Sequence, residues 1–341
     1  MKELDVLILV DSGIGNAIQA LYSIEYCLQN KVKAGIYLSR INLSFQNYLK
    51  ECYGTEIILE SMKEYSVKNL IHSFTFQEEI TVSFAHYFFI KPDFHSTKLL
   101  SETEQMLSVV KALFPSNNNS NKKTLDFLKE NYSTTVGDLG VENKYVFYPG
   151  GSPINSARRW PWFPELEKII GAHQVIFIGG KEDLNFNYSY AYPDYFRFLF
   201  SQKVLNNKKF WEVLKKIGLL ESFSHLTNLG TKDNCFIEKF SWAELVAIFR
   251  RCKKFIGNDG GLMHLAGAAG ASGFGLFGPT SVMKNKPLNP GIQPLSKSYP
   301  CEPCQFGVGN VQMVNYFINC PYGIKCLKAI KPDEVSRLIN D

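Results

Sequence analysis

Short apolar runs that end in glycine-rich turns recur along the chain. They occupy residues 6–10, 145–148, 174–178, 254–257 and 273–277, and further candidate strands lie at residues 35–38 and 56–59. An uninterrupted run of this length is typical of a strand buried on both faces of a parallel sheet. The helix-forming stretches include residues 17–28, 163–171 and 242–251, the last with Ser241 as its expected N-cap. The pattern predicts an α/β fold with doubly wound parallel sheets.

The length and one polar segment together predict two domains. At about 100–200 residues per domain, a chain of 341 residues is expected to form two. Residues 115–123 are polar and turn-rich, and the strand pattern restarts after them. We place a Rossmann-like N-terminal domain at residues 1–140, a second at residues 141–325 and a C-terminal helix at residues 326–341. Ligands bind beyond the carboxyl ends of such strands, so we expect the active site between the domains.

The composition and charge exclude several classes of protein. Apolar residues make up 45% and charged residues 20% of the chain, which excludes a largely disordered protein. The net charge of +5 is too small to indicate nucleic-acid binding, and no recognised nucleic-acid motif is present. Residues 1–140 hold 13 Lys and Arg against 16 Asp and Glu, whereas the remainder holds 24 against 16. The basic second half would attract an anionic ligand, although solvated surface lysines explain such a count equally well.

The sequence shows neither a membrane-spanning segment nor a signal peptide. Every apolar run is shorter than the roughly 18 residues that a transmembrane helix needs. Acidic residues interrupt the N-terminal stretch, and the apolar run after them is too short for a signal peptide. We therefore expect a cytoplasmic protein, and we leave open a peripheral association with the inner membrane and assembly into a homo-oligomer.

The first glycine turn invites comparison with a dinucleotide-binding motif. Residues 13–15 supply two glycines, but Ile18 stands where the third glycine of that motif belongs. The second strand ends at residues 39–40, Ser-Arg, without an acid that could bind a ribose hydroxyl. These departures disfavour a nicotinamide cofactor. The turn is either a tight strand-to-helix connection or one whose backbone N–H groups face a ligand.

Two later segments carry groups that can hold a diphosphate. Residues 148–161 combine a glycine turn with the Ser152 hydroxyl and two arginines, one of which is Arg158. Residues 255–270 combine an acid and glycines with a helix rich in small residues, whose N-terminus favours an anion. The alternatives are a plain glycine loop with surface arginines, and for His264 a histidine satisfied within the core.

In this order the motifs resemble glycosyltransferase family 9, the ADP-heptose:lipopolysaccharide heptosyltransferases. The resemblance implies a GT-B fold of two facing Rossmann-like domains, with the acceptor in the first and the sugar nucleotide in the second. It also implies an inverting transfer that needs no metal, most simply of heptose from ADP-heptose to a hydroxyl of a lipopolysaccharide-type glycan or a protein. A different nucleotide sugar, or a sugar-nucleotide-binding protein without activity, stays open. The matching segments are residues 13–16, 149–152, 158–161, 257–266, 276–280 and 326–335.

The resemblance also assigns residues to the donor site. Arg158 stands where the family has a basic residue on the diphosphate, and Ser152 would add a phosphate contact. Asp183 or its neighbour Glu182 would bind the ribose, and Phe240 would contact the nucleotide base. The full set that the resemblance implies is Gly15, Gly151, Ser152, Arg158, Glu182, Asp183, Phe240, Asp259, Gly260, Gly261, Leu262, Met263 and His264.

The catalytic base is where this sequence departs from the family. Family members commonly have Gly-Asp at the first turn, and that Asp is the proposed base, but this chain has Gly15 followed by Asn16. A neutral amide does not accept the hydroxyl proton as a carboxylate does. Asp11, at the end of the first strand, is our first candidate for the base, unless it only caps the turn. The alternatives are that Asn16 orients the acceptor while another acid serves, or that the protein binds without turnover.

Half of the eight cysteines lie in one short segment near the C-terminus. Cys301 and Cys304 form a CxxC motif, and Cys320 and Cys326 follow. Four thiols at this spacing can bind one tetrahedral zinc or iron ion, and a subset of the family that glycosylates autotransporter proteins binds iron in a similar way. The alternatives are free thiols or a disulfide. Such a metal would be structural, because the transfer itself requires no cofactor.

The acceptor cannot be read from these motifs, but one aromatic run lies in the domain expected to bind it. Phe84, His86, Tyr87 and Phe88 could stack on a sugar. An apolar core strand is the favoured interpretation of this run.

Overall fold

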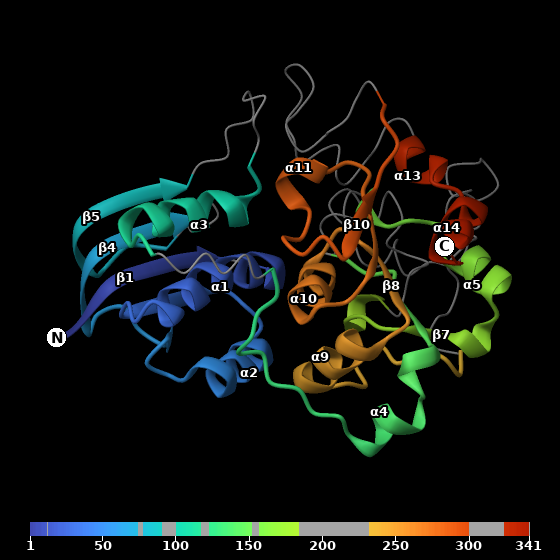
Figure 1. Ribbon diagram of the computed structural model, residues 1–341, viewed down its shortest axis with the longest axis horizontal. Coiled ribbons are helices and arrows are strands. Elements are labelled where there is room, and N and C mark those ends of the chain that lie inside the picture. Colours follow the sequence, from blue (N-terminus) through green and yellow to red (C-terminus); the bar gives the residue numbers. More distant parts are fainter. Residues whose placement is uncertain are drawn as a thin grey trace, which may run out of the picture.

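The computed structural model describes eight ranges of the chain, drawn as ribbons in Figure 1. They are residues 1–11, 13–73, 78–90, 100–116, 123–151, 157–183, 232–299 and 324–340. These ranges form two α/β halves, the first in blue to teal and the second in green to red (Figure 1). The predicted α/β fold class is therefore confirmed.

The first half contains a five-stranded sheet in the order β3-β2-β1-β4-β5, in which every strand pair is parallel. The strands are β1 (Lys2–Asp11), β2 (Ala34–Ser39), β3 (Ile58–Leu59), β4 (Tyr65–Ser73) and β5 (Ser83–Ile90). The helices of this half are α1 (Ile14–Gln29), α2 (Leu43–Tyr53) and α3 (Glu102–Leu113). Residues 6–10 of β1 are completely buried, which agrees with the buried strand predicted there.

The second half contains another parallel five-stranded sheet, in the order β10-β9-β8-β6-β7. Its strands are β6 (Tyr145–Tyr148), β7 (Val175–Phe177), β8 (Lys254–Asn258), β9 (Gly273–Leu276) and β10 (Ile292–Leu295). Its helices include α4 (Thr134–Asp138), α5 (Phe163–Ile170), α9 (Trp242–Arg251), α10 (Gly261–Ala269) and α11 (Val282–Asn285). Ser241 caps α9 in a capping box with Glu244, so the N-cap predicted there is confirmed.

The chain ends in two short helices rather than the one helix expected at residues 326–341. They are α13 (Lys325–Ala329) and α14 (Pro332–Asn340). Pro332 has no backbone N–H to donate and restricts the residue before it, so the first helix stops and a second begins there. Both helices belong to the second half: α14 packs against α5, and the indole N–H groups of Trp160 and Trp162 donate to the carbonyls of Ile330 and Lys328 at the end of α13.

The aromatic strand β5 corrects one expectation. Residues 84–88 form a strand, but they are not a core strand as favoured. Phe84, Tyr87 and Phe89 are 43%, 45% and 49% exposed. The reason is the topology: β5 is the edge strand of its sheet, which local sequence does not reveal.

The two halves meet through α1 and α10, which pack against each other near the centre of Figure 1. The stretch that leads from the first half to the second also binds two helices of the second half, α10 and α9. The N–H of Leu125 donates to the carbonyl of Ala268 in α10, and the N–H of Asn131 to that of Ala243 in α9. The boundary at residue 140 and the cytoplasmic location stay predictions. Within the eight described ranges, no helix is both long and apolar enough to cross a bilayer.

Candidate active site

Two glycine turns face each other where the halves meet. The turn between β1 and α1 begins at Gly13, which has a φ of 91° and therefore favours glycine. A Cβ at Gly15 would lie 2.9 Å from Cδ2 of His264, and a Cβ at Gly261 would lie 2.9 Å from Cβ of Ile14. Side chains at either glycine would push the N-termini of α1 and α10 apart. The glycines therefore allow the first turn of α10 to approach the first half closely.

His264 lies at this junction as a neutral imidazole. Its Nε2 is 3.4 Å from Nε2 of Gln19, an amide group on α1 in the opposite half. Burial lowers the pKa of His264 to about 4; the Asp259 carboxylate opposes this shift and the Arg158 guanidinium adds to it. A neutral ring accepts from the Gln19 amide through Nε2.

This shift predicts a pH dependence of stability. The folded state binds the proton of His264 more weakly than the unfolded chain, whose histidine pKa is near 6.5. Stability is therefore expected to fall as the pH drops from about 6.5 towards 4, by at most about 3 kcal/mol from this group. Urea unfolding of the wild type and of His264→Gln at pH 7 and pH 5 measures the difference. An equal loss in both proteins would contradict the prediction.

The predicted diphosphate residue Arg158 lies beside the predicted acid Asp259. Its Nη1 is 3.7 Å from Oδ2 of Asp259, and the amide of Asn285 donates to the same oxygen at 2.9 Å. Asp259 is buried, whereas the Arg158 side chain is 18% exposed. Asp259 follows the end of β8, so a guanidinium group, a carboxylate and the N-terminus of α10 come together beyond the carboxyl edge of the second sheet.

The neighbouring Arg159 has a different place, fully buried behind this edge. Its Nη2 donates to Oδ1 of Asp183 at 3.0 Å and to the carbonyl of Gly151 at 3.0 Å. The other carboxylate oxygen of Asp183 accepts from the N–H of Gly180 at 2.9 Å. A Cβ at Gly150 would lie 2.1 Å from Oδ2 of Asp183, so any side chain at this position would collide with the carboxylate.

Asn258 fastens the second glycine turn to the sheet. Its side-chain amide donates to the carbonyls of Pro149 and Gly150 at 2.6 and 3.0 Å, and its Oδ1 accepts from the N–H of Trp160 at 2.9 Å. All of these groups are buried, so each bond satisfies a polar group that water cannot reach. Residue 258 lies in one of the segments that resemble the family, but the sequence alone assigns it no role, because its partners are about a hundred residues away in the chain.

At the first turn, Asp11 and Asn16 are both engaged. Asp11 is completely buried, and its carboxylate accepts from Nε of Arg40 at 2.9 Å and from Nη2 of the same residue. Arg40 has a φ of 49° and a side chain that is 53% exposed. The amide of Asn16 donates to the carbonyl of Asp11 at 3.3 Å. Asp11 could accept a proton from an acceptor only after Arg40 moved, and its role as base stays a prediction.

The other predicted residues have varied positions. Leu262 and Met263, in the first turn of α10, are buried in the core. Phe240 is half-buried and stacks on Phe236 with ring centroids 5.5 Å apart. Among the described residues, a Cβ at Gly151 would meet no atom within 4 Å. Ser152, Cys301, Cys304, Cys320 and the side chain of Glu182 lie outside the described residues. Cys326 is buried in α13, and the described part of the chain contains no cluster of ligands for a metal.

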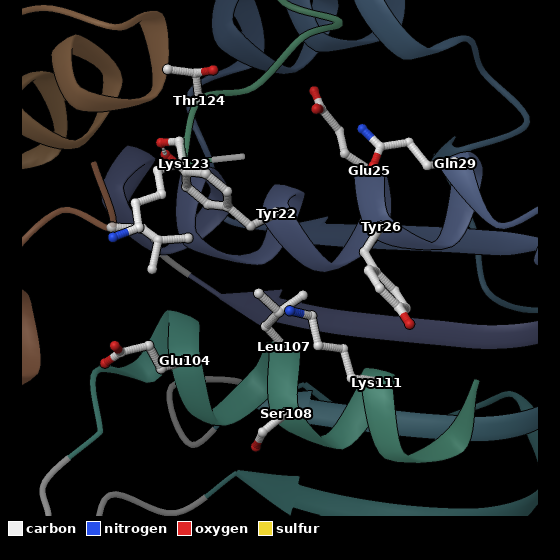
Figure 2. A pocket seen from close by; sticks show the side chains of 11 residues that line it. Tyr22, Glu25, Tyr26, Gln29, Glu104, Leu107, Ser108, Lys111, Lys123 and Thr124 are labelled. Atoms are coloured by element: carbon white, nitrogen blue, oxygen red, sulfur yellow. Dashed lines mark hydrogen bonds between the residues drawn. The ribbon is translucent and has the colours of Figure 1, made fainter. Parts of the chain in front are cut away.

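A separate hollow of about 270 Å³ lies between α1 and α3 (Figure 2). It is lined by Tyr22, Glu25 and Tyr26 of α1 and by Leu107 and Lys111 of α3. Tyr26 points towards α3, whereas the Glu25 side chain points away from it (Figure 2). None of the predicted site residues lines this hollow. Glu25 accepts from the hydroxyl of Tyr53 at 2.6 Å and from two backbone N–H groups, at residues 126 and 127. These bonds give this acid a structural role.

Comparison with known proteins supports the family resemblance. The model of glycosyltransferase family 9 (heptosyltransferase) matches residues 227–311. A comparison of the sequence with curated proteins finds no match.

Solved structures match nearly the whole chain. ADP-heptose LPS heptosyltransferase II of E. coli is 15% identical, with a TM-score of 0.53, over 100% of this chain and 98% of its own. A family 9 glycosyl transferase from Veillonella parvula is 12% identical, with a TM-score of 0.51, over 99% and 97%. The iron-containing dodecameric glycosyltransferase TibC from enterotoxigenic E. coli H10407 is 14% identical, with a TM-score of 0.56, over 100% and 76%. The predicted GT-B fold is therefore confirmed. The resemblance to glycosyltransferase family 9, the heptosyltransferases, is confirmed by the family model over residues 227–311.

Proposed function

We propose that this chain is a glycosyltransferase that moves a sugar from a nucleotide diphosphate to a hydroxyl group. The observation that carries the proposal is the position of Arg158 and Asp259 beside the N-terminus of α10, against the first turn of the opposite half. A guanidinium group and a helix N-terminus both stabilise a departing diphosphate. The family model supports the proposal, because the residues it matches, 227–311, include Asp259 and α10.

For the donor we propose ADP-heptose. One solved structure similar to this chain, the heptosyltransferase TibC, is a complex with ADP-D-β-D-heptose. It is 15% identical to this chain, with a TM-score of 0.56, so its ligand supports the donor class and leaves the individual contacts to experiment. We assign the ribose contact to Glu182 rather than Asp183, because both oxygens of Asp183 accept from Arg159 and Gly180.

In the reaction we propose, the acceptor hydroxyl attacks the anomeric carbon while the bond from that carbon to the diphosphate breaks. The configuration at the anomeric carbon inverts, and the acceptor proton passes to a base. Arg158 and the N-terminus of α10 stabilise the negative charge that the leaving diphosphate gains. Asp11 remains our candidate for the base: Arg40, which holds it, is half exposed and can turn towards solvent or substrate.

A protein that binds the donor without transferring its sugar is the alternative function. It is favoured by Asn16, which carries an amide where the family has a carboxylate, and by the engagement of Asp11 with Arg40. Transfer from a different nucleotide sugar is the other alternative.

The test is incubation of the purified chain with ADP-heptose and with UDP- and GDP-linked sugars. The measurements are the thermal shift and the nucleoside diphosphate released without acceptor, because many transferases slowly hydrolyse their own donor. We expect a shift with ADP-heptose and release of ADP above the rate without protein. A shift without release from any sugar would support the binding protein, and no shift with any nucleotide would refute both.

We further propose that Cys301, Cys304, Cys320 and Cys326 bind one structural zinc or iron ion. The spacing supports a tetrahedral thiolate site, and TibC is an iron-containing protein. We expect about one metal ion per chain, by elemental analysis of protein purified without chelator. Cys301→Ser combined with Cys304→Ser should lose the metal, while Cys252→Ser, outside this group, should keep it. Metal-free wild-type protein would contradict the proposal.

The acceptor and the assembly also remain proposals. We expect the first half to bind the hydroxyl-bearing glycan or protein, and the exposed aromatic side chains of β5 are candidates to contact a sugar. TibC is a dodecamer, which supports a homo-oligomer as a hypothesis for this chain.

A further inference from the structure

The short helix α11 buries a lysine that no sequence motif singled out. Lys284 is only 7% exposed. An ammonium group that is removed from water is costly and rare, and it is retained where its charge faces an opposite charge. The charged groups around Lys284 therefore indicate its role.

Lys284 belongs to the cluster around Asp259. The next residue, Asn285, donates to Oδ2 of Asp259 at 2.9 Å, and Arg158 approaches the same oxygen at 3.7 Å. Ser281 caps α11 by accepting from the N–H of Lys284, which fixes the backbone of this turn. Arg158 and Asn285 thus both approach the buried Asp259 carboxylate at the start of α10, and Lys284 is the residue directly before Asn285.

The opposite half supplies a second carboxylate. Glu102, the first residue of α3, is 5% exposed, and α11 lies towards this end of α3 in Figure 1. Burial lowers the pKa of Lys284; the charges of Glu102 and Asp259 act against this shift, and that of Arg158 adds to it. The charges of Asp259 in the second half and of Glu102 in the first half therefore both act on Lys284.

The turn before α11 contains a buried hydroxyl that has no hydrogen-bond partner among the described residues. Thr280 is 3% exposed, and its hydroxyl has no hydrogen-bond partner within the described part of the chain. A buried hydroxyl without a partner is unfavourable, so its presence at this edge of the sheet points to a polar ligand.

We propose that Lys284 is a second cation of the diphosphate site and binds the outer phosphate, the one bonded to the sugar, beside Arg158. The inference rests on the proposed function. With two cations and a helix N-terminus at the leaving group, the charge on the departing diphosphate is neutralised by side chains of the protein.

The experiment compares nucleoside diphosphates with monophosphates, because only the former carry the outer phosphate. The wild type is titrated by calorimetry with ADP, UDP and GDP, and the diphosphate that binds most tightly is then used with its monophosphate. Lys284→Met should weaken the diphosphate about 10- to 100-fold and leave the affinity for the monophosphate unchanged. Lys284→Arg keeps the charge and should retain most of the diphosphate affinity. Lys286→Met, two residues further along, is the matched control and should change neither affinity.

The results test the role of Lys284 and the proposed function separately. Unchanged diphosphate binding in Lys284→Met, an equal loss of both ligands, or the same loss in Lys286→Met would overturn the role of Lys284. A wild-type chain that binds none of the diphosphates would refute the proposed function itself. The melting temperature of each variant is measured first; if Lys284→Met is unstable, Lys284→Gln takes its place in the same comparison.

Discussion

Replacing Arg158 by glutamine is expected to slow donor cleavage by about 100- to 1000-fold while the protein stays folded. The guanidinium group of Arg158 reaches Asp259 beside the N-terminus of α10, where the proposed leaving group gains charge. Its side chain is partly exposed, so its loss leaves no large buried cavity. Glutamine keeps a hydrogen-bond donor but removes the charge, and an interaction that strengthens in the transition state is lost mainly from kcat.

The measurement is the rate of nucleoside diphosphate release at saturating donor, together with the melting temperature. Arg251→Gln is the matched control, because Arg251 makes a similar ion pair with Glu130 on the surface, remote from the site. We expect that control to keep the wild-type rate. Arg158→Gln with an unchanged rate would remove Arg158 from the mechanism, and a rate that falls only with the melting temperature would make its role structural.

Much of the fold could be predicted because its signals are local. The apolar run of β1 and the glycine turn after it lie within about fifteen residues of each other, and the capping residues of α9 are three apart. The spatial position of β5 could not be predicted in this way. Its aromatic side chains favour a strand, but whether a strand is central or at the edge depends on pairing with a distant segment.

The site was predicted less completely for the same physical reason. The glycines and Arg158 lie in compact motifs, and their chemistry can be read from residue types. The role that we propose for Lys284 depends on Asp259 and on Glu102 in the opposite half, and the sequence around Lys284 does not reveal it. Asp183 shows the converse: the family resemblance implies a ribose contact for it or for Glu182, but Arg159 engages the Asp183 carboxylate in the structure. Pairings between distant residues decide which acid is exposed to a ligand.

Replacing Arg159 by methionine is expected to destabilise the fold by about 3–5 kcal/mol, in contrast to the adjacent Arg158. Arg159 is completely buried, and it is the partner of the buried Asp183 carboxylate. Without the guanidinium group, the charged Asp183 carboxylate would stay in the interior. Of its two hydrogen bonds described above, it would keep the one from the N–H of Gly180. The carbonyl of Gly151 would also lose its bond, which should loosen the turn next to the proposed diphosphate site.

Urea unfolding of a double-mutant cycle separates the pair from its surroundings. Arg159→Met and Asp183→Leu are each expected to be strongly destabilising, since each leaves one buried charge behind. The double variant removes both charges, so it should be more stable than the sum of the two single losses predicts. Additive losses, or an Arg159→Met variant as stable as the wild type, would show that this ion pair does not hold the turn. Since the Gly151 carbonyl that Arg159 holds belongs to that turn, a loosened but folded variant should also bind nucleoside diphosphate more weakly.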